Sequence, residues 1–398
     1  MNPKKKILIL TADAGFGHRS AANALAAAFQ EAGEGSCECS IVNPADDPRT
    51  PDIIRRPQLE YDWAVRSVPH AYQLSYELSD TERASRALES AIAQLMAGMF
   101  QDLLRAYAPD AILSTYLLYN IALRTALIRN QMNIPFFLVV TDLADVHHLW
   151  FQPGPDMFFV PTEITRQTAM RNHIRPERIV VTGLPVSSKI AREKRDRTSL
   201  RRMLGWDPDL PVVMAVGSQR VLSLYDYLRA VDGSRTALQL AVVAGGNRAL
   251  YDRSCSSTWK SPVHCYDYAR NMPEMLHAAD LVMTKAGGLI TSEALACSLP
   301  LVFIEAIPGQ ETGNASYVCE RSAGVMVKTP LEAQATIDRW LAGDRSVLEQ
   351  FSRNAGELGT PEAAHRIAEE VLRAIQEKRQ RYPFSSSAEA RQVPAVVQ

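Results

Sequence analysis

Glycine-rich motifs that follow apolar runs carry the residues of this chain most suited to chemistry. The first, Gly15-Phe16-Gly17-His18, follows the run Lys6–Thr11 and precedes an alanine-rich stretch. Glycines allow the tight turn that such a place needs, and the first N–H groups of the following helix are free to bind an anion. His18 there can accept a proton near neutral pH, so it is a candidate general base.

The same motif has a second interpretation. Ser20 stands where a dinucleotide-binding fingerprint has its third glycine or alanine, and no acidic residue stands at a convincing strand end about 20 residues further on. These two departures count against the fingerprint, and a dinucleotide-dependent dehydrogenase stays only as an alternative. Protection of the fold by NAD and not by UDP would favour it.

Two more motifs have the geometry that cradles phosphates. Gly217-Ser218-Gln219 follows the run Val212–Val216, and Gly287-Gly288 follows Leu281–Thr284. Both offer backbone N–H groups to a diphosphate. Glu293 falls about one and a half turns into the helix expected after the second motif. A carboxylate there can accept two hydrogen bonds from a vicinal diol such as that of ribose.

A fourth motif offers amides, which suit sugar hydroxyls. In the segment from Pro308 to Asn314, Gln310 and Asn314 are four residues apart and would share one face of a helix. The alternative for this motif is turn chemistry with a helix cap.

The loop Thr141–Trp150 combines two aspartates with two histidines, which first indicates a metal site. His147 and His148 are adjacent, so their side chains point in different directions, and no third ligand has a clear spacing. We therefore interpret this loop, which includes Asp142, as a polar segment that faces an acceptor.

The elements that must position these residues alternate between strand and helix, which favours parallel sheets with crossover helices. Short apolar runs predict strands in two groups, separated by a break near residues 183–190. They are listed here in chain order: Lys6–Thr11, Cys37–Asn43, Ala111–Ser114, Phe136–Thr141, Met157–Val160, Ile179–Thr182, Val212–Val216, Leu238–Val243, Leu281–Thr284 and Leu301–Ile304. Ligands of such sheets bind outside the carboxyl ends of the strands, so two such domains predict a cleft between them.

We therefore divide the chain into a domain over residues 1–183 and a second over 190–355. A last helix over 361–380 is expected to pack back towards the first domain. Residues 381–398, rich in Ser, Ala, Val and Gln, are expected to be a disordered tail.

Composition narrows the class of protein. The 398 residues carry 43 basic and 44 acidic side chains and a net charge of −1. A protein that binds the phosphate backbone of nucleic acid should have a basic excess, so this balance weighs against that class of protein. The six cysteines include no CxxC pair, so we expect reduced thiols and no structural metal. No apolar run reaches the length of a membrane span, so any membrane contact should be peripheral.

An aromatic stretch offers one place for such contact. Tyr61, Trp63, Tyr72 and Tyr76 stand near several arginines, a combination that suits a membrane interface, with core packing as the alternative.

Taken together, the motifs resemble the glycosyltransferases related to monogalactosyldiacylglycerol synthases and processive diacylglycerol glucosyltransferases. More distantly, they resemble the N-acetylglucosaminyltransferase of peptidoglycan synthesis. The likeness spans about residues 5–375 and is most specific over Asn271–Gly324, with weaker support from Ile7–Ala22, Tyr61–Asp80 and Val139–Phe151. It implies the GT-B fold, in which two Rossmann-like α/β domains with parallel sheets face an interdomain cleft.

The resemblance also implies roles for individual residues. His18 and Asp142 would be catalytic, and Gly15, Gly17, His147 and Trp150 would lie at the acceptor. The donor, a UDP-sugar, would contact a set in the second domain: Gly217, Ser218, Gln219, Gly287, Gly288, Glu293, Gln310, Glu311 and Asn314. Tyr61–Asp80 would help to dock the lipid-bearing surface. Phe16 and Arg220 depart from the family pattern, which usually has glycine at these places.

The expected activity is an inverting, metal-independent transfer of a hexose from UDP-galactose or UDP-glucose to diacylglycerol, without a cofactor. The expected place is the cytoplasm, at the inner face of the cytoplasmic membrane. Besides the dehydrogenase, three alternatives stay open: N-acetylglucosaminyl transfer to a polyprenyl-linked acceptor, a UDP-sugar epimerase or hydrolase, and a UDP-sugar-binding protein without catalysis. The sugar, the acceptor, processivity and the oligomeric state are not fixed by the sequence.

Overall fold

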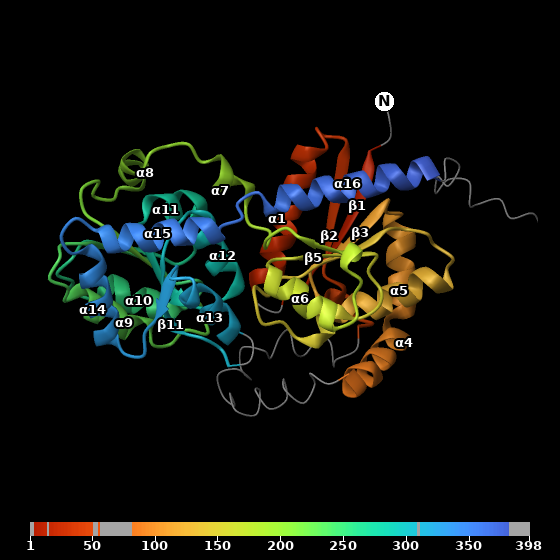
Figure 1. Cartoon of the computed structure of the whole chain (residues 1–398), viewed down its shortest axis with the longest axis horizontal. Coiled ribbons are helices and arrows are strands. Elements are labelled where there is room, and N and C mark those ends of the chain that lie inside the picture. The colour runs from red at the N-terminus through yellow and green to blue at the C-terminus, as the bar shows by residue number, and fades with distance from the viewer. Residues whose placement is uncertain (1–3, 14–15, 51–54, 56–81, 309–310, 382–398) are drawn as a thin grey trace, which may run out of the picture.

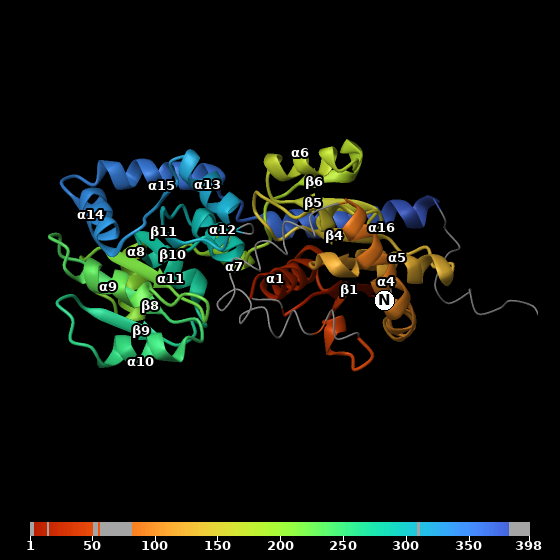
Figure 2. The ribbon, with the colours of Figure 1, turned by 90° about the horizontal axis from the view of Figure 1, so that it is seen from below.

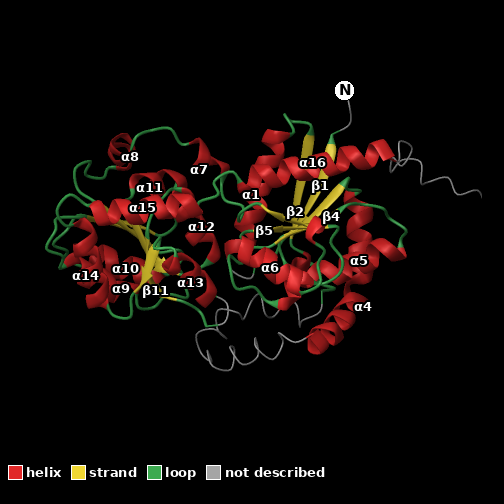
Figure 3. Cartoon of the chain, viewed as in Figure 1, coloured by secondary structure: helices red, strands yellow, loops and turns green. Residues whose placement is uncertain are grey.

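The computed structural model describes residues 4–13, 16–50, 55, 82–308 and 311–381. Within them the chain forms two α/β domains side by side (Figure 1), each built on a six-stranded parallel sheet (Figure 3). The prediction of two parallel-sheet domains is therefore confirmed. The aromatic segment Tyr61–Asp80 lies outside the described residues, as do Gly15, Gln310 and the tail from residue 382.

The first sheet has the strand order β2-β1-β3-β4-β5-β6. Its strands are β1 (Lys5–Leu10), β2 (Cys37–Val42), β3 (Ala111–Ser114), β4 (Phe136–Val139), β5 (Met157–Val160) and β6 (Ile179–Val181). The described helices that flank it are α1 (Phe16–Ala32), α4 (Glu82–Tyr107), α5 (Asn120–Arg129), α6 (Glu163–Arg171) and α16 (Ala363–Arg381), with short 3₁₀ turns η1 (Pro44–Asp46), η2 (Leu117–Tyr119), η3 (His148–Phe151) and η4 (Pro176–Arg178).

The second sheet has the order β12-β11-β10-β7-β8-β9. Its strands are β7 (Val212–Val216), β8 (Gln239–Val243), β9 (Val263–Tyr266), β10 (Leu281–Lys285), β11 (Leu301–Glu305) and β12 (Gly324–Met326). Its helices are α7 (Ser188–Arg192), α8 (Arg197–Leu204), α9 (Leu224–Asp232), α10 (Arg248–Ser256), α11 (Met272–Ala278), α12 (Gly288–Ala296), α13 (Thr312–Glu320), α14 (Pro330–Leu341) and α15 (Ser346–Leu358).

The central strands of both sheets are buried on their two faces, which explains why they are apolar runs without alternation. In the first sheet, Ile7 and Ile9 of β1 pack towards α1 and α16, whereas Leu8 and Leu10 pack towards α4 and α5. In the second, Val213 of β7 belongs to the core on the side of α9 and α14. The opposite core lies under α8, α11, α12 and α15.

The strand order reverses once in each sheet, between β1 and β3 in the first and between β7 and β10 in the second. β1 pairs with β2 on one side and with β3 on the other, and β7 pairs with β8 and β10. At such a reversal the connections leave in opposite directions, so the carboxyl ends of the two strands at the reversal open a crevice for a ligand. In this chain the crevices lie after β1 and β3 and after β7 and β10.

The chain crosses between the domains twice, at neighbouring points. Gly183 has φ +97°, and a Cβ there would overlap the Thr360 side chain, so the outgoing and returning segments touch. Beside this point, Arg192 of α7 makes a two-pronged ion pair with Glu31 of α1, with both distances 2.6 Å. Beyond Thr360, α16 runs back over the first domain (Figures 1 and 2).

Replacing Ile367 of α16 by alanine should destabilise the first domain by about 2–5 kcal/mol, because the fully buried side chain leaves a cavity between α16, α1 and the sheet. Urea unfolding followed by circular dichroism measures the loss. Arg373→Ala, on the exposed side of the same helix, removes only a surface ion pair with Glu370 and should cost less than about 1 kcal/mol. Equal losses in the two variants would contradict this role for α16.

Candidate functional site

The candidate site in the first domain is built around His18, in the first turn of α1. The helix begins at Phe16, so His18 lies in its first turn, at the crevice between β1 and β3. Its ring nitrogen Nδ1 lies 2.7 Å from the Thr115 carbonyl oxygen and 2.9 Å from the Thr141 hydroxyl. Thr115 follows β3 and Thr141 follows β4.

These contacts determine which nitrogen of His18 carries the proton. A carbonyl oxygen only accepts hydrogen bonds, so Nδ1 must be protonated to donate to Thr115. The other nitrogen, Nε2, then carries the lone pair of the neutral ring. His18 is thus prepared to accept a proton at Nε2, as a general base requires.

Burial lowers the pKa of His18 to about 4, with the positive charge of Arg220 as a further lowering cause. The bond to the Thr115 carbonyl and the charge of Asp13 act in the opposite direction. The imidazole is therefore neutral at physiological pH. Since Arg220 belongs to the second domain, this electrostatic influence crosses the cleft.

Asp142 stands beside the same crevice and is held by Trp150. The indole Nε1 of Trp150 donates to the Asp142 carboxylate over 2.7 Å, and the indole centroid lies 6.2 Å from that of the His18 ring. Burial, together with the charges of Glu311 and Asp145, raises the pKa of Asp142 to about 6. Trp150 is fully buried, so its influence on the site passes through the carboxylate that it orients.

Among the other residues predicted for the acceptor, Gly17 lies in the first turn of α1, next to His18. His147 is buried, and its Nδ1 accepts the backbone N–H of Leu149, so this side chain caps η3. The neighbouring His148 bonds to Asn172, away from His18. Within the residues that the structure describes, no three His, Cys, Asp or Glu side chains gather as metal ligands.

The second domain contributes the loops after β7 and β10. The register pairs Val216 with Thr284, and the Thr284 hydroxyl donates to the Val216 carbonyl over 2.8 Å, so the two loops start side by side. Asn247 donates to the Ser218 carbonyl and thereby fixes the loop after β7. Gly287 caps α12, which begins at Gly288. The structure thus places Gly217, Ser218, Gln219, Gly287 and Gly288 at one crevice, where free N–H groups favour an anion.

Glu293 lies in the second turn of α12, and burial raises its pKa to about 7. A carboxylate that is partly buried in this way gains from hydrogen bonds donated by a ligand. Asn314 of α13 donates to the Ala286 carbonyl over 3.0 Å, while its buried Oδ1 has no partner. That oxygen can accept a hydrogen bond from a ligand hydroxyl.

Glu311 is already occupied within the protein. It is buried, pairs with Lys285 at the end of β10, and accepts the backbone N–H of Ile307 over 3.1 Å. The helix α13 begins at Thr312, so the helical face that the spacing predicts for Gln310 and Asn314 is not tested by the described residues.

Several site residues were not identified from the sequence. Thr115 belongs to no motif, and Thr141 stands out in the sequence only as the first residue of the loop that carries Asp142. The pairing of β3 with β1 and β4 brings both threonines to His18. Gly245 and Gly246 lie next to the loop after β7, and both have positive φ, +60° and +80°. The pattern that marks the other loops, an apolar strand followed by a glycine pair, is present at this place and could have identified them.

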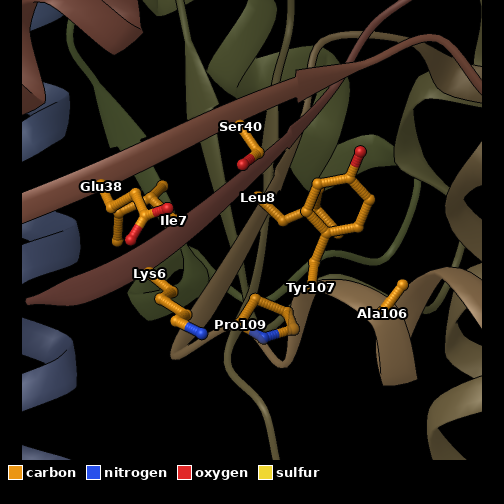
Figure 4. Close-up of a pocket in the computed structure, with 8 residues that line it drawn as sticks. All are labelled: Lys6, Ile7, Leu8, Glu38, Ser40, Ala106, Tyr107 and Pro109. Atoms are coloured by element: carbon orange, nitrogen blue, oxygen red, sulfur yellow. The ribbon is translucent and has the colours of Figure 1, made fainter.

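The two crevices meet at the segment after β4. A Cβ on Gly288 would lie 3.0 Å from the Thr141 carbonyl oxygen, and a Cβ on Gly313 would overlap Asp145. The amino ends of α12 and α13 therefore rest directly on the loop that carries Thr141 and Asp142. A separate pocket, lined by Lys6, Glu38, Ser40 and Tyr107 among others (Figure 4), lies at the amino-terminal half of β1, away from these strand ends.

His18 should titrate with a pKa near 4 and carry its neutral-state proton on Nδ1, because burial disfavours the charged ring and the Thr115 carbonyl requires a donor. Long-range ¹H–¹⁵N spectra of histidine-labelled protein between pH 3.5 and 8 would measure both properties. The variant His18→Gln assigns the signal. A ring that is protonated on Nε2 at pH 7, or that titrates near the unperturbed value of about 6.5, would contradict this arrangement.

Comparisons with known proteins agree with this organisation. The family profile described as "Monogalactosyldiacylglycerol (MGDG) synthase" matches residues 18–186, and "Glycosyltransferase family 28 C-terminal domain" matches residues 212–342. "Probable monogalactosyldiacylglycerol synthase 2, chloroplastic" from Oryza sativa subsp. japonica is 30% identical over 387 residues, which cover 94% of this chain and 81% of the rice protein.

Solved structures support the fold. The "S. aureus MnaA-UDP co-structure" superposes with a TM-score of 0.60 at 15% identity, covering 94% of this chain and 97% of that one. Acinetobacter baumannii MurG gives 0.58 at 15% identity, covering 94% and 100%. The fold predicted from the sequence, GT-B, is thereby confirmed.

Proposed function

Because the chain belongs to the monogalactosyldiacylglycerol synthase family and is a glycosyltransferase, we propose that it transfers a hexose from UDP-galactose or UDP-glucose to diacylglycerol. The observation that carries the proposal is the pairing of two features across one cleft. A neutral His18 with its lone pair on Nε2 lies in one domain, and the glycine-capped amino end of α12 lies in the other. The names of the relatives support a galactolipid product, and a neighbour's title supports UDP.

The reaction needs a base because an acceptor hydroxyl has a high pKa. His18 removes that proton through Nε2 while the oxygen attacks the anomeric carbon. The bond from that carbon to the UDP oxygen breaks on the opposite face, so the configuration inverts. General-base catalysis of this kind contributes about 10²–10⁴-fold in rate. As the imidazolium forms, the Thr115 carbonyl stabilises its Nδ1–H.

The departing UDP gathers negative charge on its β-phosphate. The N–H groups at the start of α12 and the loop at Ser218 stabilise that charge, with Arg220 nearby, and no metal ion or cofactor is included in the proposal. Binding of the diphosphate also offsets the charge of Arg220, one of the groups that lower the pKa of His18. Donor binding therefore makes His18 a stronger base.

The acceptor is proposed to come from a membrane surface. None of the helices in the described part of the chain is both long and apolar enough to cross a bilayer. We place the protein at the inner face of the cytoplasmic membrane as a peripheral enzyme, with Tyr61–Asp80 as its docking segment. Co-sedimentation with liposomes tests this placement.

The experiment that tests the function is UDP release from a panel of UDP-sugars, with liposomes that contain or lack diacylglycerol. We expect release that needs both one UDP-hexose and diacylglycerol. The variant His18→Gln should lower kcat by about 10²–10⁴-fold while UDP still binds, because the base is lost and the second domain is unchanged. Near-normal turnover of a folded His18→Gln protein would remove the base assignment.

Other outcomes of the same panel identify the alternatives. Release without an acceptor would indicate an epimerase or hydrolase, and release only with UDP-N-acetylglucosamine and a polyprenyl-linked acceptor would indicate the peptidoglycan-type reaction. Binding of UDP without any release would indicate a non-catalytic binding protein. Each of these results would replace the proposal.

Glu293 is proposed to bind the ribose of the donor. At pH 8, where its carboxylate is ionised, Glu293→Gln should raise the donor KM by about 10-fold or more and change kcat less, because a charge-assisted hydrogen bond to the diol is weakened. Initial rates at varied UDP-sugar measure both constants. The matched control is Glu320→Gln, because Glu320 is exposed at the carboxyl end of α13. An unchanged donor KM in Glu293→Gln would refute the assignment.

A further inference from the structure

The imidazole of His18 is held at Nδ1 by two oxygens from two different strand ends. The Thr115 carbonyl at 2.7 Å takes the Nδ1 proton, and the Thr141 hydroxyl lies at 2.9 Å. Thr115 is itself tied to the helix, since its hydroxyl donates to the His18 carbonyl over 3.2 Å. Both described hydrogen bonds of the ring are at Nδ1, and both partners are uncharged oxygens.

One acceptor leaves the ring some rotation about its χ1 and χ2 bonds, because a hydrogen bond tolerates a range of angles. A second oxygen beside the same nitrogen also restricts that rotation, and with it the direction of the lone pair on Nε2. Thr115 alone therefore determines the protonation of His18, whereas Thr141 determines where the base points. The Thr141 side chain is buried and cannot exchange this role with bulk water.

Thr141 is also the point at which the other domain touches this arrangement. Its carbonyl oxygen lies against Gly288, where a Cβ would come within 3.0 Å. Four residues on, Asp145 lies against Gly313 at the start of α13 so closely that a Cβ there would overlap it. The segment from Thr141 to Asp145 is thus enclosed between His18 and the amino ends of two helices that face the donor crevice.

We propose that Thr141 is a positioning residue that couples the amino end of α12 to the orientation of His18. When α12 rests on the Thr141 carbonyl, the hydroxyl of the same residue is held at Nδ1 and Nε2 points into the cleft. When α12 moves away, the second contact on the ring loosens. The base is therefore aligned only while the donor-binding domain is in place. The proposal rests on the proposed function for its effect on rate, but its geometry can be measured without substrate.

A plain structural role for Thr141 is the competing explanation, because a buried threonine contributes to packing wherever it lies. Two variants separate the possibilities. Thr141→Val keeps the shape and removes the hydroxyl, whereas Thr141→Ser keeps the hydroxyl and removes the methyl group. Packing alone predicts that serine is no better than valine, and positioning predicts that serine restores the native state of His18.

The first measurement is made on ligand-free protein. In ¹H–¹⁵N spectra at pH 7, Thr141→Val should shift the Nδ1 and Nε2 signals of His18, and Thr141→Ser should keep them near the wild-type values. Gly288→Ala, which presses on the Thr141 carbonyl, should shift them as well, while Gly98→Ala, whose added Cβ meets nothing within 4 Å, should not. Signals unchanged in Thr141→Val or in Gly288→Ala would overturn the proposal, as would serine behaving like valine.

The second measurement is the steady-state rate with the UDP-sugar and lipid identified by the panel. Thr141→Val should lower kcat by about 10–100-fold with the donor KM within about 3-fold, and Thr141→Ser should recover most of the rate. A Thr141→Val enzyme with native kcat would overturn the positioning role. If the wild-type protein transfers no sugar, the proposed function fails, whereas the spectra still decide the coupling of Gly288, Thr141 and His18.

Discussion

The parallel pairing of β1 with β3 and of β7 with β10 is the constraint on which every other feature of the site depends. Because all strands run the same way, their carboxyl ends share one edge, and the loops that leave these ends gather there. His18 meets Thr115 for this reason, although 97 residues separate them in the chain. The loops at Ser218 and Gly287 come together for the same reason. In the proposed reaction, each domain supplies half of the chemistry.

The site also has unusual proton affinities. Burial lowers the pKa of His18 and raises those of Asp142 and Glu293, since each charged form loses hydration in the cleft. The charges of Arg220 on His18 and of Glu311 on Asp142 act across the domain boundary. His18 is thus a weak base in the arrangement described, and in the proposed reaction a bound nucleotide diphosphate adds negative charge that raises its proton affinity.

The sequence predicts the fold well because apolar runs in a parallel sheet need no alternation to be recognised. The two strands it misses, Val263–Tyr266 and Gly324–Met326, lie at opposite edges of the second sheet, where one is half-buried and polar and the other is three residues long. The glycine loops can be recognised in the sequence because only glycine fits where the backbone of these loops lies so close to neighbouring atoms. The partners of His18 could not be predicted, since threonine is common after a strand and only the strand order of the sheet places it beside the imidazole. For the same reason, the sequence does not show that Glu311 forms an ion pair with Lys285.

The absence of a described carboxylate on Nδ1 of His18 has a physical consequence for the reaction. A carboxylate would stabilise the imidazolium whether or not a donor were bound, and the base would then remain protonated over a wider range of pH. With two uncharged oxygens as its partners the ring stays neutral, and the pKa of His18 depends on the charges around it. A diphosphate bound at the start of α12 can then raise that affinity when an acceptor proton must be removed. In the proposed reaction, the weak partners of His18 thus connect proton removal to the presence of the donor.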